Sequence, residues 1–461
     1  MRVKIITLLL CQAILNINGS YAASLEQTVA TALDTHPDIR QSFARFKSKE
    51  EDVDRATGGY LPTIDITAGY GYEYTDTPAN RLTNFGVDDG TTELKRGEFG
   101  VSLRQMLFDG MLTRSEVKRT KFEASAEQWT LISTAEDLAL FVSQAYLNCL
   151  KTEQLVVLSE KNVASHQDIY NQIKERTDSG LGSIADLSQV TGRLARAQSN
   201  LISARNNYRD AQTEFIRLTN VPPDDLVMPV PDADMLPKDK ASGLIFALER
   251  HPVIKSAQQD IKAARAYSGS VKSNYYPKFY LDLEANADNN LAGEDGISLA
   301  GVDVGGHRND VSVMVRMEYN LYAGGKDAAL ERSAAYKTIE AQEINYSAHR
   351  QVTESYGLAW NAYEMLGLQK QYIQTHVETS KETQSAYLQQ FTLGQRNLLD
   401  LLDTENELFQ ARQDYLDANF DELGARYRLL NATGQLLDSL RVTRSDKWQG
   451  KLDYDEGVEY E

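Results

Sequence analysis

Four stretches of the chain alternate strictly between apolar and polar residues. After Pro62 the even positions 64 to 74 are apolar or aromatic, whereas the odd positions 63 to 73 are small, polar or acidic. The same alternation predicts strands at about 63–75, 98–108, 278–288 and 310–321. Each predicted strand has an apolar face and a polar face, and is about as long as the 9 to 11 residues of a tilted membrane strand.

The alternation alone fits either a half-buried soluble sheet or a membrane sheet. Charges on the polar faces, and the lack of further strands to form a second packing layer, favour the membrane. Aromatic residues near the strand ends, where an interfacial girdle would lie, are Tyr60, Tyr70, Phe108, Tyr275, Tyr280 and Tyr322. Four strands cannot close a barrel, so several copies of the chain must pool their strands.

Two long stretches space small and apolar residues in steps of four and three. One begins at Leu131 and the other runs from Leu408 to Ala432. This period of seven predicts left-handed supercoiled helices. A single helix from Gly110 to about Thr177 would be ~100 Å long, which suits the wall of a tube better than a globular core.

The chain is internally duplicated. His36-Pro37 matches His251-Pro252, and Tyr60-Leu61-Pro62 matches Tyr275-Tyr276-Pro277, both at an offset of 215 residues. The predicted organisation is a signal peptide 1–22, a first repeat 23–220, a proline-rich linker 221–240, a second repeat 241–434 and an acidic tail 435–461.

Charge and targeting narrow the function. Arg2 and Lys4 precede an apolar stretch and the small-residue site Ser20-Tyr21-Ala22, as in a secretory signal. The formal charge of −18 argues against a nucleic-acid partner. Only Cys149 would remain after cleavage, so no intrachain disulfide is expected. No later stretch has 18 apolar residues, and no transmembrane helix is expected.

Catalytic chemistry is not evident in the sequence. The six histidines are scattered without metal-ligand spacing, and no nucleophile motif or cofactor site stands out. We therefore expect no enzyme, no cofactor and no metal site. Any energy for transport must come from another protein.

Each repeat has one turn between its long helical stretches. Gly180 and Gly394 lie in these turns, and each is followed six residues later by an aspartate, Asp186 or Asp400. Glycine permits a tight reversal, and a carboxylate suits the positive N-terminal end of the next helix.

The motifs YLP, LFDG, LYAGG, SGLGSIADL and FTLGQRNLLDLLD, in this order and spacing, resemble those of TolC-type outer-membrane efflux and secretion channels. The resemblance implies a mostly α-helical mixed fold in a homotrimer. Four strands from each chain would form a 12-stranded transmembrane β-barrel, continued by an antiparallel coiled-coil tunnel in the periplasm. It also implies a periplasmic adaptor, an inner-membrane ABC or RND transporter, and a location in the lipid of the outer membrane.

In that family the inner end of the tunnel is closed by a gate. The resemblance places the gate arginine at Arg396, the ring aspartates at Asp400 and Asp403, and the carboxylate that pairs with the arginine at Asp186. Phe391 stands where a gate tyrosine is expected and lacks its hydroxyl. Fewer ties would leave the gate more dependent on the Arg396–Asp186 pair.

The spacing of Asp400 and Asp403 agrees with this role. Residues three apart share a helix face, so three copies would bring six carboxylates together at a constriction that attracts cations. Taken alone, the two aspartates also suit an early helical turn.

The predicted function is a passive exit duct, with its gate opened by partner docking. The overall character of the sequence resembles channels of type I protein secretion more than channels of drug efflux. Multidrug efflux is the alternative. A periplasm-spanning structural or adhesive coiled coil without a lumen is an alternative of a different class.

Overall fold

The computed structural model describes residues 24–76, 91–293 and 306–450. The predicted signal peptide and the acidic residues 453–461 lie outside these ranges. The chain forms two compact units. The first, which we call the helical unit, comprises the chain up to Arg40, Ser133–His251 and Val352–Arg444. The second, the sheet unit, comprises Gln41–Ile132, Pro252–Gln351 and the chain from Ser445.

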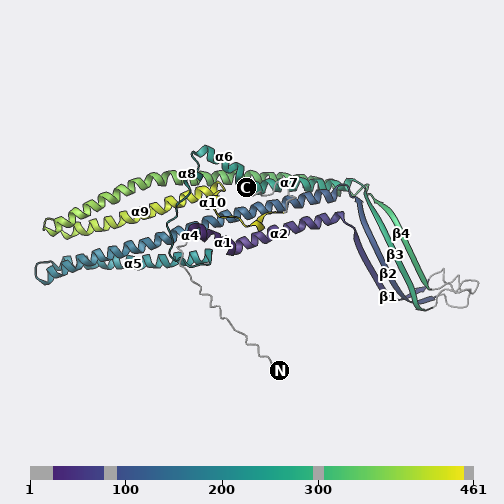
Figure 1. The fold of residues 1–461 in the computed structure, drawn as a ribbon, viewed down its shortest axis with the longest axis horizontal. Helices are drawn as coiled ribbons and strands as arrows, with labels where there is room; N and C mark the ends of the chain where they lie inside the picture. Colours follow the sequence, from purple (N-terminus) through teal and green to yellow (C-terminus); the bar gives the residue numbers. More distant parts are fainter. Residues whose placement is uncertain (1–23, 77–90, 294–305, 451–461) are drawn as a thin grey trace, which may run out of the picture. The chain divides into compact units, whose positions relative to one another are not determined.

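Each half of the chain contributes two helices of 11 and 21 residues, two strands, one helix of 67 residues and one of 35 or 36 residues, and the second half adds the short α10 (Figure 1). The first half contains α1 Leu25–Thr35, α2 Pro37–Thr57, β1 Thr63–Asp76, β2 Thr91–Phe108, α4 Leu112–Asp178 and α5 Ile184–Thr219. The second half contains α6 Lys240–Arg250, α7 Pro252–Lys272, β3 Lys278–Gly293, β4 His307–Glu318, α8 Lys326–Thr392, α9 Leu398–Ala432 and α10 Leu436–Ser439. The mostly helical, duplicated fold predicted from the sequence is confirmed.

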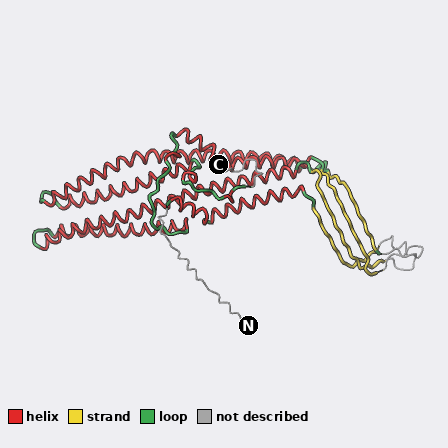
Figure 2. Tube along the Cα trace, in the orientation of Figure 1, coloured by secondary structure: helices red, strands yellow, loops and turns green. Residues whose placement is uncertain are grey.

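The four strands, yellow in Figure 2, form one antiparallel sheet in the order β1-β2-β3-β4. The strand register places apolar residues opposite apolar residues and polar residues opposite polar residues on neighbouring strands. One row contains Ile64, Leu103, Leu283 and Val313, and the next contains Asp65, Ser102, Glu284 and Ser312. Because side chains alternate between faces, the apolar residues gather on one face. Large members of that face are exposed in the chain, including Ile66 at 69% and Val315 at 66%.

The strand bounds differ from the predicted ones. β2 begins at Thr91, seven residues before the predicted start, and β3 continues to Gly293. Arg96 explains part of this extension, since its guanidinium pairs with Glu73 of β1 at 3.0 Å and Asp288 of β3 at 3.2 Å. β4 ends at Glu318 rather than 321, because the Asn320 side chain accepts the N–H of Tyr322 at 3.1 Å and forms a local turn.

The predicted seven-residue pattern corresponds to the buried seams of the helical unit. Ala135, Leu138, Val142, Ala145 and Cys149 of α4 are all buried, at 5% exposure or less. On α9 the buried seam residues are Leu408, Ala411, Ala418, Glu422, Ala425, Leu429 and Ala432. Small side chains at these positions allow neighbouring helices to approach closely.

The segment after Gly434 is more ordered than an acidic tail. Leu436 and Leu437 of α10 are fully buried, and their N–H groups donate to the carboxylate of Glu136 in α4 at 2.9 and 3.4 Å. The helical pattern breaks at Gly434, whose φ is +73°. Because the helical pattern stops at this glycine, the sequence did not predict that the apolar residues after it are buried in the core.

The proline-rich segment between the repeats is anchored to α4. The Tyr146 hydroxyl donates to the carbonyl of Val227 at 2.6 Å and accepts its N–H at 2.9 Å. This segment contains only a short 3₁₀ turn at Ala233–Met235 between α5 and α6. Across the described ranges, no helix has a stretch apolar enough to cross a membrane.

Candidate functional site: the paired helix turns

The turns α4–α5 and α8–α9 have the same backbone geometry. Gly180 and Gly394 have φ angles of +77° and +74°, in the left-handed region. After each glycine a backbone N–H bonds back across the turn: Leu181 donates to Arg176 at 2.8 Å, and Gln395 donates to Gln390 at 2.8 Å. This pattern ends a helix most easily at glycine, which has no Cβ to oppose a positive φ.

The helices that leave the turns begin with polar caps. Ser183 accepts the N–H of Ala185 at 3.1 Å, and Asn397 accepts the N–H of Asp400 at 2.8 Å. Asp186 and Asp400 lie in the first turns of α5 and α9. A carboxylate there interacts favourably with the exposed N–H groups and the positive end of the helix dipole.

Directly behind the turns lies one apolar cluster to which all four helices contribute. Its buried members are Ile169, Ile173, Val190, Phe391, Leu398, Leu401 and Leu402. Phe391 is 7% exposed, and the guanidinium of Arg176 lies 5.7 Å from the centre of its ring. Phe391 is thus a packing residue, and the apolar cluster holds the two hairpins together near their turns.

Arg396 is held by its own hairpin. Its Nε donates to Gln390 at 2.9 Å, and its guanidinium lies 3.4 Å from the Asp400 carboxylate and 4.0 Å from the centre of the Tyr387 ring. Arg396 lies in the turn two residues before α9 begins, and Asp400 lies in the first turn of that helix, so the two side chains meet at the start of α9. Within the described part of one chain, Arg396 forms no ion pair with Asp186. Tyr387 and Gln390 were missed in the sequence, although both lie within ten residues before Arg396.

Asp403 is paired across the repeats. The guanidinium of Arg193 in α5 lies 2.8 Å from its carboxylate, and the Asp403 side chain remains 58% exposed. Both predicted ring aspartates therefore have an arginine partner inside the chain. Sequence reasoning missed Arg193 because 210 residues separate it from Asp403, and no local pattern connects the two.

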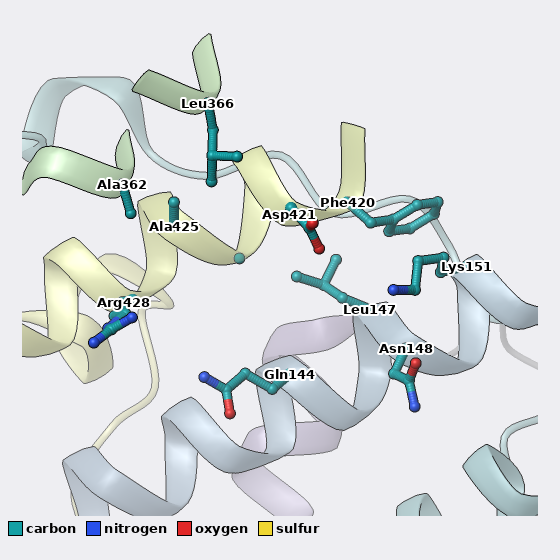
Figure 3. Close-up of a pocket in the computed structure, with 11 residues that line it drawn as sticks. Gln144, Leu147, Asn148, Lys151, Ala362, Leu366, Phe420, Asp421, Ala425 and Arg428 are labelled. Carbon is teal, nitrogen blue, oxygen red and sulfur yellow. The ribbon is translucent and has the colours of Figure 1, made fainter. Parts of the chain in front are cut away.

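A groove on the helical unit is a second place to look for chemistry (Figure 3). Leu147, Leu366, Phe420 and Ala425 give it an apolar lining, which Lys151, Asp421 and Arg428 interrupt. It is lined by no histidine or cysteine and by a single carboxylate. Over the described ranges, no group of three or more His, Cys, Asp or Glu residues could hold a metal ion. The turns thus remain the candidate site.

Comparisons with known proteins agree with this geometry. The family model for outer membrane efflux proteins matches residues 28–221 and 246–435. The outer membrane efflux protein BepC of Brucella suis is 25% identical over 428 residues, which cover 93% of this chain and 89% of BepC. The outer membrane protein TolC of Escherichia coli is 23% identical over 428 residues, which cover 90% of this chain and 83% of TolC.

Solved structures share the fold. The CmeC outer membrane channel of Campylobacter jejuni aligns with a TM-score of 0.77 at 16% identity, over 89% of this chain and 86% of CmeC. The MtrE channel of Neisseria gonorrhoeae, solved in an open state, aligns with a TM-score of 0.71 at 18% identity, over 90% of this chain and 89% of MtrE. With both repeats matched by the family model, the chain belongs to the outer membrane efflux protein family, whose members are channels of the outer membrane and not enzymes.

Proposed function

We propose that this family member is the outer-membrane exit duct of a tripartite export machine and that the paired helix turns are its gate. One observation carries the proposal: two hairpins converge on a single apolar cluster, and Asp400 and Asp403 alternate with its members Leu398, Leu401 and Leu402 on α9. A duct closed by packed helix ends opens when the hairpins separate. Partner contacts then only need to outweigh the packing and ion pairs that hold the ends together.

The assembly we propose is a homotrimer. The exposed apolar face of each four-stranded sheet would contact outer-membrane lipid, and three sheets together would close into twelve strands. The polar face, with Arg104 and Arg316 both paired to Asp282, would line the passage. The helices would extend the duct into the periplasm.

At the gate, Asp400 and Asp403 of three copies would form a ring of carboxylates. Within each copy, Arg396 and Arg193 each pair with one of these aspartates, and the three carboxylates Asp186, Asp400 and Asp403 outnumber the two guanidinium groups. Asp186 has no ion pair within the described chain, so a pair with Arg396 would have to form between copies.

The proposed partners are a periplasmic adaptor and an inner-membrane ABC or RND transporter. Sequence texture supports type I protein secretion as the task. The names of relatives support a second candidate, small-molecule efflux, since one relative is the toluene efflux pump outer membrane protein TtgC of Pseudomonas putida. Deletion of the gene in its host separates the two. Loss of a secreted protein supports the first, and sensitivity to small toxic compounds supports the second.

The duct itself is tested by inserting the purified protein into a planar bilayer. A small, cation-selective conductance is the expected result, because the gate ring is acidic. A well-folded trimer that inserts but carries no current would contradict the duct and favour a structural coiled coil without a lumen.

A further inference from the structure

A buried carboxylate on α9 joins the two hairpins a short way behind the turns. Glu405 is 7% exposed and lies two residues after Asp403 on the same helix. The Ser165 hydroxyl of α4 donates to one of its oxygens at 3.2 Å, and the Gln384 amide of α8 donates to the other. One side chain thus bridges three helices, and we call this set the Glu405 bridge.

The Glu405 bridge has no counter-charge of its own. In the part of the chain that the structure describes, neither lysine nor arginine forms an ion pair with Glu405, and both of its donors are neutral. A buried carboxylate without a cation costs free energy, so an apolar residue of similar size would serve stability at least as well. A satisfied buried polar group does, however, favour one arrangement of helices over its alternatives.

We propose that Glu405 is a positioning residue of the gate, which fixes α9, and with it Asp400 and Asp403, relative to α4 and α8. The inference rests on the proposed function of the turns. The Arg193–Asp403 pair adds the remaining helix, α5, so two neighbouring residues of α9 contact all three other helices. Without the bridge, α9 keeps its apolar packing and the Arg193–Asp403 pair but loses its polar contacts to α4 and α8, so the aspartates leave their closed positions more readily.

His166 makes this position sensitive to pH. It is 4% exposed, and its Nδ1 has no hydrogen-bond partner. Burial lowers the pKa of His166; the Glu405 charge opposes this effect and Arg193 of α5 adds to it. Among the described residues of α8, the one that donates to the bridge is the neutral Gln384. One turn away on α4, the neighbours are the uncharged Asn162, Val163, Ile169 and Tyr170.

The sign of the pH effect follows from the lowered pKa. The closed packing favours the neutral imidazole, so its full stability is present above the ordinary histidine pKa of about 6.5. This stability is lost as the pH falls below that value through the lowered pKa. Acidification therefore loosens the helices around Glu405.

The test compares single-channel recordings of three variants with wild type. Glu405→Ala removes the bridge and is expected to raise the open-to-closed ratio about tenfold, as loss of hydrogen bonds to a charged group suggests. Glu405→Gln should stay near wild type, because the Gln384 amide can reverse and bond to it. Glu407→Ala, at an exposed position of the same helix, is the matched control and should change nothing.

Two further measurements separate positioning from a purely structural role. If Glu405→Ala lowers the melting temperature but has the same open-to-closed ratio as Glu407→Ala, the inference is overturned. The proposed function as a duct is unaffected by that result. A wild-type trimer without conductance would overturn the duct itself. If Glu405→Ala does not fold, Gln384→Ala removes one donor and should open the gate to a smaller extent.

The pH profile is the readout that packing alone would not change. Wild type should open more often between pH 7 and pH 5, and His166→Gln should show no such increase. An equal increase in His166→Gln would contradict the coupling between His166 and the bridge.

Discussion

Arg193 of α5 and Asp403 of α9 form an ion pair of 2.8 Å that connects the first repeat of the chain to the second. The pair places a positive charge beside an aspartate that the proposed gate uses to attract cations. Arg193 is therefore expected to lower the affinity of the carboxylate ring for cations as well as to join the hairpins.

Replacing Arg193 with glutamine removes this charge. Exposed ion pairs contribute about 0.2–1 kcal/mol each, and three copies act together. We expect divalent cations to block the Arg193→Gln channel at a concentration lower by about three- to tenfold. Arg196→Gln, at an exposed position of the same helix, serves as the control. Equal block in both variants would show that the pair does not affect the ring.

The turn glycine Gly394 offers a test of backbone geometry. Its φ of +74° opposes any side chain, although a Cβ there would meet no atom within 4 Å. Gly394→Ala should therefore destabilise the fold through strain alone, by about 1–2 kcal/mol. Gly367→Ala is the contrasting control, because Gly367 lies inside α8 with open space around it.

In that control, alanine should stabilise the helix by about 0.5–1 kcal/mol. Thermal unfolding in detergent reports both changes. Shifts of the same sign in the two variants would contradict the account of the turn.

The apolar cluster behind the turns predicts a stability effect coupled to gating. Leu402 is fully buried in it, and Leu402→Ala should cost about 2–5 kcal/mol through lost packing and the cavity left behind. Since the cluster joins both hairpins, the variant should also open more often. Leu399→Ala, at an exposed neighbouring position, should leave both properties unchanged. A melting temperature unaltered by Leu402→Ala would contradict the packing described.

Glu136 predicts how stability depends on pH. Burial raises the pKa of its carboxyl from 4.5 to about 8, with Asp438 adding to the effect. The fold favours the protonated form, so this contribution to stability is full below pH 4.5 and is lost as the pH rises towards 8. The melting temperature should fall more steeply between pH 5 and 9 in wild type than in Glu136→Gln. Glu153 is exposed, and in Glu153→Gln the melting temperature should depend on pH as it does in wild type. If the melting temperatures of wild type and Glu136→Gln depend on pH equally, Glu136 does not cause the pH dependence.

The sequence predicted what is encoded by local periodicity. The two-residue alternation around Ile66 predicted a strand, and the seven-residue spacing that includes Ala135 predicted a supercoiled helix, because both periods follow from backbone geometry. The strand ends were less predictable, since β2 is extended by Arg96, whose partner Asp288 lies 192 residues away.

Contacts between the repeats account for what the sequence did not predict at the candidate site. Nothing in the local sequence distinguishes Glu405 from an exposed acidic residue. It is buried by the packing of α4, α8 and α9. The Arg193–Asp403 pair is equally remote in sequence. Phe391 was identified as a departure from the family pattern, and its burial in the apolar cluster shows what this side chain contacts instead.

In the proposed gate, Asp400 and Asp403 form the cation-binding ring of a conducting duct. The most direct measurement is the planar-bilayer conductance of wild type and of the double variant Asp400→Ala/Asp403→Ala, with divalent cations added on the gate side. Divalent cations should block the wild-type current, and the double variant, still folded and trimeric, should conduct without block. Block of equal strength in both proteins would contradict it.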